Sequence, residues 1–207
     1  MVLEINTSLY EKLPQSFYER EDVVQIARDL LGMLLVTNIQ DKLVAGRIVE
    51  TEAYCGRGDK ACHANNKRTP RTEVMYQRGG VAYVYLCYGI HHLMNVVTNK
   101  EGLADAVLIR GLEPVHGIAH MMERRKYTNS KLSAGPGTLT QAMGITTSMN
   151  GADLLGDHIW ISSPSEMIPF DTITSTRIGV DYAGDDALLP WRFYVEGNKF
   201  VSKPVKQ

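Results

Sequence analysis

Cysteine is scarce in this sequence: the chain of 207 residues contains three, Cys55, Cys62 and Cys87. Their number is odd, and no two of them have the CxxC spacing of zinc and redox motifs. The pattern therefore favours neither a disulfide framework nor a tetrahedral zinc site. We expect free, partly buried thiols, and neither a metal nor a cofactor.

Long apolar runs are also absent. No stretch reaches the roughly 18 apolar residues that a membrane-spanning helix needs. The first residues, Met-Val-Leu-Glu-Ile-Asn, lack the basic and then apolar pattern of a secretory signal. We therefore expect a cytoplasmic protein without membrane contact, associated with the nucleoid if the source is bacterial.

A net excess of either charge is missing as well. The 22 Lys and Arg residues stand against 23 Asp and Glu residues, which gives a net charge of -1 and counts mildly against a nucleic-acid partner. Positive charge gathers locally, in residues 57–78 and 124–131. Within the first segment, Lys67, Arg68 and Arg71 are candidate contacts to a DNA backbone, although a charged segment is also typical of ordinary solvated surface.

Periodic patterns indicate a mixture of helices and strands. Apolar residues recur at helical spacing over residues 21–31, and Gly32 is a typical helix end. Pro114 suits a first helical turn, so a second helix is expected from there to Arg125, and a short one near Thr138. Short segments rich in β-branched and aromatic residues predict strands at 33–36, 43–54, 81–88, 92–98, 106–110, around Trp160, 177–180 and 192–195.

This order of elements predicts an α+β fold. We expect one domain over residues 1–207, with a curved, mainly antiparallel sheet and peripheral helices. Residues 1–16 and 202–207 have little periodic pattern and are expected to be loosely ordered. A monomer is the default expectation.

One predicted strand carries two carboxylates. In residues 47–54, Arg-Ile-Val-Glu-Thr-Glu-Ala-Tyr, the two-residue period of a strand places Glu50, Glu52 and Tyr54 on the same face. Burying ionised carboxylates is costly unless they are paired or used. The pattern indicates either a functional cleft or the solvated face of an edge strand.

A second strand is rich in tyrosine. In residues 83–89, Tyr-Val-Tyr-Leu-Cys-Tyr-Gly, Tyr83 and Tyr85 share one face, and Tyr88 precedes a glycine where the chain can turn. Tyrosines of this kind are common core residues. Near basic segments they also suit stacking on nucleobases.

These motifs resemble, in order, those of the alkylpurine (3-methyladenine) DNA glycosylase family, over residues from about Phe17 to Ser202. The most specific matches are residues 47–54 with His63, residues 69–71 (Thr-Pro-Arg), and residues 83–89 with Met94-Asn95. Further matches are residues 108–110, 112–114, 135–136, 177–180 and 192–195.

The resemblance implies an enzyme that flips alkylated or deaminated purines out of duplex DNA and hydrolyses the N-glycosidic bond. Glu52 would be the general base that activates the attacking water, with Glu50 as its supporting neighbour. Arg110 and the main-chain carbonyl of Ile178 would help to hold that water.

The same resemblance assigns the contacts to damaged double-stranded DNA. Tyr54, His63 and Tyr85 would sandwich the extruded base. Tyr88 would act as the wedge that fills its place in the duplex. Asn95 would stand against the 2-amino group of guanine and discourage its excision.

The implied reaction is base excision without strand cleavage, because no lysine in the matched motifs is placed to form a Schiff base. The product would be an abasic site. Thr138 stands where the family often has a lysine, and Ile90 and His91 are not a close match. The preference among 3-methyladenine, 7-methylguanine, hypoxanthine and ethenoadenine therefore stays open.

Two other interpretations compete with this one. A metal-dependent hydrolase would use potential ligands that are clustered in the sequence: Glu52, Cys55, Cys62, His63, His91 and His92. Their spacing matches no HExxH or CxxC pattern. A non-catalytic protein that binds damaged DNA would use the basic segments and Tyr88, but it would have no need for Glu52, whose charge weakens affinity for phosphates.

Overall fold

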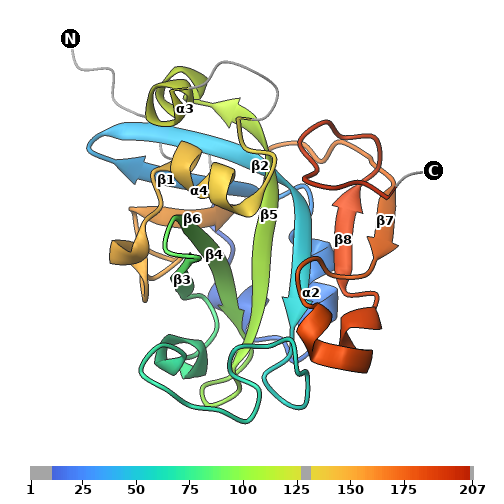
Figure 1. Ribbon diagram of the computed structural model, residues 1–207. Coiled ribbons are helices and arrows are strands. Elements are labelled where there is room, and N and C mark those ends of the chain that lie inside the picture. Colours follow the sequence, from blue (N-terminus) through green and yellow to red (C-terminus); the bar gives the residue numbers. More distant parts are fainter. Residues whose placement is uncertain (1–10, 127–131, 206–207) are drawn as a thin grey trace.

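The computed structural model describes residues 11–126 and 132–205, which contain one curled, eight-stranded antiparallel sheet with helices around it (Figure 1). Six strands follow the order β3-β4-β5-β2-β1-β6, and β8 pairs with both β2 and β7. The strands are β1 (Leu34–Ile39), β2 (Lys42–Tyr54), β3 (Ala82–Cys87), β4 (His91–Thr98), β5 (Asp105–His116), β6 (Ile159–Ser162), β7 (Thr172–Ser175) and β8 (Arg192–Val195).

The long strand β2 organises the sheet. Its first half pairs with β1, residues 50–52 pair with β8, and β5 runs along its other edge. Nearly every residue of β2 from Leu43 to Ala53 is buried, because the sheet curls around a core on one side and is covered on the other. The carboxylate pair of this strand therefore lies in the interior.

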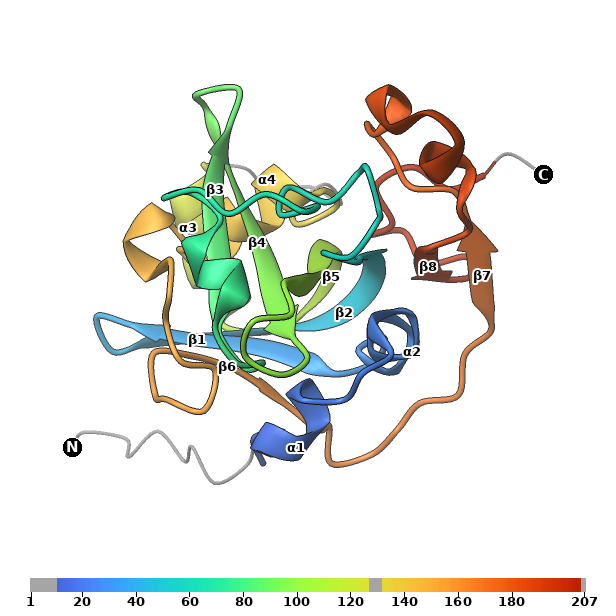
Figure 2. The same ribbon diagram turned by 90° about the horizontal axis from the view of Figure 1, so that it is seen from below.

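The α-helices of the described residues are α1 (Gln15–Tyr18), α2 (Val23–Asp29), α3 (Ile118–Arg125) and α4 (Pro136–Met143). The 3-10 helices are η2 (Glu73–Tyr76), η3 (Thr147–Met149) and η4 (Asp181–Leu188). Asp22 caps α2 by accepting hydrogen bonds from the next turn, and the fully buried Ile26 and Leu30 then face the core. Figure 2 shows the β3–β4 hairpin projecting from the body on the side away from α1 and α2.

The predicted α+β class with a curved antiparallel sheet is confirmed, and so are most of the expected strands. The helix expected from Pro114 is wrong at its start. Pro114 belongs to β5, opposite Gly46, and α3 begins only after Gly117, whose φ of 67° turns the chain. A side chain at Gly117 would lie 2.4 Å from the Leu43 carbonyl oxygen, so glycine is required there.

The strand expected at residues 177–180 is also wrong. These residues form a loop in which Gly179 has a φ of 76°, and the strand beside β8 is β7, residues 172–175. The alternating apolar pattern of 177–180 reflects contacts with the candidate site rather than sheet pairing.

Both ends of the described chain are held by the body of the protein. Leu13 and Tyr18 are buried, and the Ser202 main-chain N–H donates to Glu50. Residues 1–10 and 206–207, where loose order was expected, lie outside the described residues, as does Lys131 of the second basic segment. Within the described ranges, no helix has the length and apolar character needed to cross a membrane.

Candidate active site

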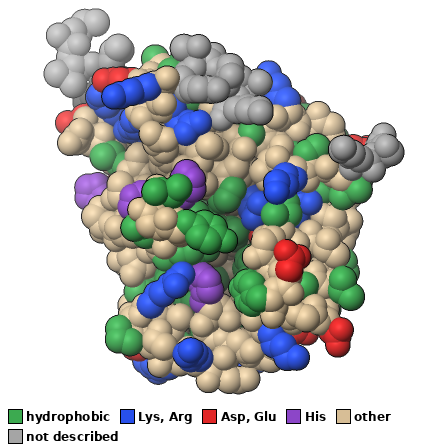
Figure 3. All heavy atoms as spheres, viewed as in Figure 1, with side chains coloured by type: hydrophobic (Ala, Val, Ile, Leu, Met, Phe, Trp, Pro, Cys, Tyr) green, Lys and Arg blue, Asp and Glu red, His purple; other side chains and the backbone are tan. Residues whose placement is uncertain are grey.

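A cavity of about 390 Å³ opens on one face, within the range of about 300–1,000 Å³ that is usual for small-molecule sites. Figure 3 shows it as a central hollow edged by hydrophobic and histidine side chains, with Lys and Arg side chains around it and acidic ones to its right. It lies between β2, β3, β4 and β5 and the 177–180 loop. Its lining includes Tyr54, His63, Arg71, Tyr83, Tyr85, Tyr88, Asn95, Arg110 and Ile178.

Glu52 lies behind the wall of this cavity with no exposed surface. Three donors hold its carboxylate: the Tyr54 hydroxyl at 2.8 Å, Arg110 Nη1 at 3.1 Å and the Ile178 main-chain N–H at 2.7 Å. All three of these residues line the cavity. An ionised carboxylate has about four acceptor positions, so one remains beyond these three donors.

Glu50 is the second buried carboxylate and is paired more completely. Its oxygens accept hydrogen bonds from Arg110 Nε at 3.2 Å, Arg192 Nε at 2.8 Å, and both the main-chain N–H and the hydroxyl of Ser202 at 2.6 and 2.9 Å. Arg110 therefore bridges the two carboxylates, which confirms that they share a face of β2. Two buried arginines balance two buried carboxylates in this cluster.

The electrostatics of Arg110 follow from this bridging position. Burial alone would lower its pKa, but the neighbouring Glu52 and Glu50 outweigh burial and raise it. Arg110 is consequently a permanent cation whose charge is compensated inside the protein.

The loop that presents Ile178 is anchored by a buried ion pair. Arg177 contacts both oxygens of Asp59, at 2.6 and 2.8 Å, and donates to the Ala53 and Asp186 carbonyl oxygens at 2.9 Å each. Its guanidinium carbon lies 4.9 Å from the centre of the Tyr54 ring. Arg177 thus fixes the loop against the end of β2, next to the Glu52 carboxylate.

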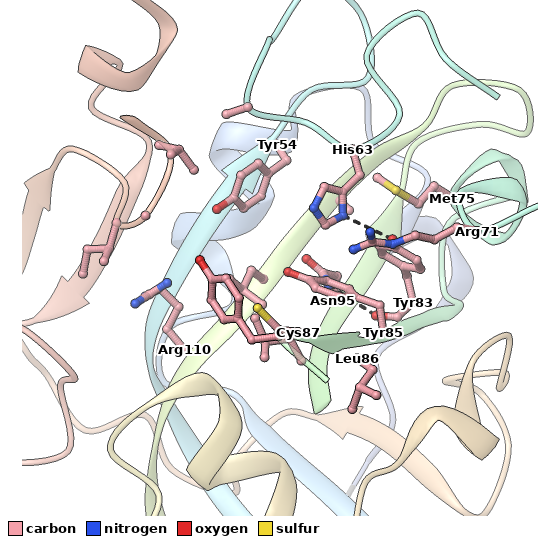
Figure 4. Close-up of a pocket in the computed structure, with 18 of the residues that line it drawn as sticks. Tyr54, His63, Arg71, Met75, Tyr83, Tyr85, Leu86, Cys87, Asn95 and Arg110 are labelled. Atoms are coloured by element: carbon pink, nitrogen blue, oxygen red, sulfur yellow. Dashed lines mark hydrogen bonds between the residues drawn. The ribbon is translucent and has the colours of Figure 1, made fainter. Parts of the chain in front are cut away.

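The aromatic side chains of Tyr54, His63 and Tyr85 form walls of the cavity (Figure 4). His63 makes an edge contact with Tyr85 at 4.8 Å between ring centres, and its Nδ1 lies 3.2 Å from the Tyr83 hydroxyl. Burial, and secondarily the charge of Arg71, lowers the pKa of His63 to about 4. Burial, followed by the charge of Glu52, holds the pKa of Tyr54 well above its usual range, so Tyr54 remains a hydrogen-bond donor.

The remaining residues predicted to contact DNA lie around the same hollow. Asn95 is buried on β4, lines the cavity and donates to the Tyr83 carbonyl oxygen at 3.3 Å. Tyr88 sits at the tip of the β3–β4 hairpin with φ of 49° and 93% of its surface exposed. Ile90 beside it is 71% exposed. The hairpin therefore presents an apolar tip at the cavity mouth.

The three candidate backbone-contact residues separate in the structure. Lys67 is exposed, and the exposed Arg68 pairs with Glu73 at 2.5 and 2.9 Å. Arg71 instead lines the cavity, with its guanidinium carbon 4.9 Å from the centre of the Tyr85 ring. The first basic segment thus contributes both to the surface and to the cavity wall.

The sequence alone predicts no role for four residues of this site: Asp59, Arg177, Arg192 and Ser202. Asp59 lies 118 positions from its partner Arg177, and Glu50 lies 142 positions from Arg192. Only folding brings such pairs together, although an arginine directly before Ile178 was a usable signal. In the described part of the chain, no three His, Cys, Asp or Glu side chains are grouped so as to hold a metal ion, so the metal-hydrolase interpretation has no ligand set there.

Comparison of the sequence with known proteins identifies a family and several relatives. The sequence profile of the methylpurine-DNA glycosylases matches residues 16–199. A protein of Natranaerobius thermophilus named "putative 3-methyladenine DNA glycosylase" is 45% identical over 196 residues, which are 92% of this chain and 98% of its own length. Proteins with the same name from Methanoculleus marisnigri and Chlamydia felis are 47% and 46% identical, over 92% and 90% of this chain and 98% and 97% of their own.

A cavity walled by aromatic rings, with a buried carboxylate behind it and an exposed hairpin tip beside it, is the kind of site a DNA glycosylase requires. The chain belongs to the methylpurine-DNA glycosylase family. It is accordingly a DNA repair enzyme of the 3-methyladenine DNA glycosylase type, a hydrolase that acts on N-glycosidic bonds.

Proposed function

We propose that this enzyme extrudes alkylated or deaminated purines from duplex DNA and releases them with a water molecule activated by Glu52. The observation that carries the proposal is the Glu52 carboxylate, which is fully buried, held by three donors and adjacent to an aromatic cavity. Positioning of a general base in this way typically contributes about 10²–10⁴-fold to a rate.

Extrusion begins at the β3–β4 hairpin. Tyr88 enters the duplex and replaces the stacking that the flipped nucleotide loses, which lowers the cost of a few kcal/mol for unstacking. Lys67 and Arg68 contact the DNA backbone nearby, and exposed main-chain N–H groups donate to its phosphate oxygens. The high exposure of Tyr88 supports this role.

The extruded base is then held in the cavity. Tyr54 stacks on one side of the base, and His63 and Tyr85 stack on the other. Asn95 meets the base edge and rejects the 2-amino group of normal guanine. The inward position of all four residues on the cavity wall supports this arrangement.

Hydrolysis takes place at the junction of the cavity and the carboxylate cluster. Arg110 and the Ile178 carbonyl orient the water, and Glu52 takes its proton as the oxygen attacks the anomeric carbon of the sugar. The purine leaves and the DNA retains an abasic site. The described cavity lining contains no lysine, in keeping with base release without strand cleavage.

The test is release of free base from duplexes that carry 3-methyladenine, 7-methylguanine, hypoxanthine or ethenoadenine. Glu52→Gln should reduce release by about 10²-fold or more while DNA binding persists. Glu113→Gln is the matched control: it makes the same change at a residue of β5 that does not line the cavity, so base release should be unaffected. No release by the unmodified protein, with binding intact, would instead identify a non-catalytic damaged-DNA-binding protein.

A further inference from the structure

Arg71 lines the cavity, although Lys67, Arg68 and Pro70 just before it in the sequence are exposed. Its guanidinium carbon lies 4.9 Å from the centre of the Tyr85 ring. Figure 4 shows the side chain directed toward the cavity, with its guanidinium beside the His63 ring. Arg71 is exposed, so it stands at the mouth rather than at the floor.

The charge of Arg71 is not compensated by the protein. Among residues 11–126 and 132–205, no carboxylate oxygen lies within 4.0 Å of Arg71. Arg110, the other arginine of the lining, is neutralised by Glu50 and Glu52. His63 is uncharged at neutral pH, since its pKa lies near 4. The cavity therefore presents a net positive charge from Arg71.

This charge bears on which bases the cavity accepts. The electron-rich ring of Tyr85 already engages one cation, so the attraction that this ring offers to a second cation is reduced. A purine alkylated on a ring nitrogen carries positive charge and is also repelled by the guanidinium directly. A neutral purine meets no such repulsion, and its carbonyl oxygen or ring nitrogens can accept hydrogen bonds from Arg71.

Resting on the proposed function, we propose that Arg71 makes the cavity selective for neutral purine lesions, such as hypoxanthine, over positively charged alkylated purines, such as 7-methylguanine. Arg71 acts as a specificity-determining residue and takes no part in the hydrolysis. Repulsion between two like charges that share one cavity is strong enough to change a rate ratio by about tenfold.

The experiment compares single-turnover release of 7-methylguanine and of hypoxanthine from duplexes of the same sequence at pH 6. At that pH, 7-methylguanine is cationic while His63 stays neutral. Arg71→Met keeps the unbranched stem and removes the charge, so the ratio of the 7-methylguanine rate to the hypoxanthine rate should rise about tenfold. Arg71→Lys keeps the charge and should leave the ratio near that of the unmodified protein.

Lys67→Met is the matched control, because it removes a charge from the same segment outside the cavity lining. It should slow both reactions equally and leave their ratio unchanged. If Arg71→Met behaves like Lys67→Met, Arg71 is a phosphate contact and the selectivity proposal is overturned.

A binding measurement separates this proposal from the proposed function. In a Glu52→Gln background, Arg71→Met should raise affinity for the 7-methylguanine duplex relative to the hypoxanthine duplex, whether or not catalysis occurs. Absence of base release by the unmodified protein would overturn the glycosylase mechanism. An unchanged affinity ratio would overturn the role of Arg71.

Discussion

Replacing Arg177 with methionine removes the anchor of the loop that contacts Glu52. The Arg177 and Asp59 side chains are 0% and 1% exposed, and two hydrogen bonds of 2.6 and 2.8 Å join them. The substitution leaves the Asp59 carboxylate buried without its cation. It also removes the donors to the Ala53 and Asp186 carbonyl oxygens, which tie the loop to the end of β2 and to η4.

The size of the effect follows from that burial. Removing one partner of a buried ion pair costs about 3–5 kcal/mol. For a chain of this length, each kcal/mol lowers the thermal midpoint by about 2–4 °C. Arg177→Met should therefore lower the thermal midpoint by about 6–20 °C, measured by circular dichroism. In a urea titration the free energy of unfolding should fall by about 3–5 kcal/mol. Base release measured well below the new midpoint should also slow, since the Ile178 N–H no longer holds Glu52 in place.

Arg68→Met provides the control. It breaks the same type of two-bonded arginine–carboxylate pair, but Arg68 and Glu73 are 59% and 54% exposed. Exposed pairs contribute about 0–1 kcal/mol, so the midpoint should change by less than about 4 °C. Equal changes in the two variants would refute the reasoning that burial makes the Arg177–Asp59 pair a structural anchor.

Two further predictions concern the cavity walls. Burial, and to a lesser extent Arg71, lowers the pKa of His63 from 6.5 to about 4, so between these pH values the unfolded chain binds a proton at His63 that the folded chain does not. Lowering the pH from 7 to 4 should reduce the free energy of unfolding, measured by urea titration, by up to about 3 kcal/mol more in the unmodified protein than in the His63→Gln variant. Equal pH dependence of the free energy of unfolding in the two proteins would contradict this. Tyr54→Phe keeps the aromatic ring but removes the 2.8 Å hydrogen bond to Glu52. A charge-assisted hydrogen bond is worth about 1.5–3 kcal/mol, so base release should slow by about 10- to 100-fold. An unchanged single-turnover rate would count against a positioning role.

Much of the sheet could be predicted from the sequence because β-branched and aromatic residues mark its central strands. The two errors have physical causes. Pro114 suits a first helical turn, but a proline also fits an irregular strand end, and β2 and β5 shift register between Ala45 and Gly46, opposite Pro114. The apolar residues of 177–180 pack against the site, so they resemble a strand without pairing as one.

The candidate site was predicted less completely than the fold. Motifs along β2 and β3 located Glu52, Tyr54 and Tyr85 because each motif is continuous in the sequence. The partners that hold the carboxylates come from distant segments, as the bonds of Glu50 to Arg192 and Ser202 show. A formal charge balance gives no indication of which charges are buried together. Such pairings require the three-dimensional structure.

The carboxylate cluster also explains why the end of the chain matters for the site. Arg192 donates to Glu50 and to the Lys203 carbonyl oxygen, and Ser202 donates twice to Glu50. Because Arg192 and Ser202 already donate to Glu50, Arg110 can also donate to Glu52, and both carboxylates are paired. Since an unpaired buried charge is strongly destabilising, the packing of residues 192–203 against β2 supports the position of Glu52 through Glu50 and Arg110. The cavity walls come from β2 to β5 and the loops, whereas the position of the Glu52 carboxylate also depends on residues 192–203, which lie far along the chain.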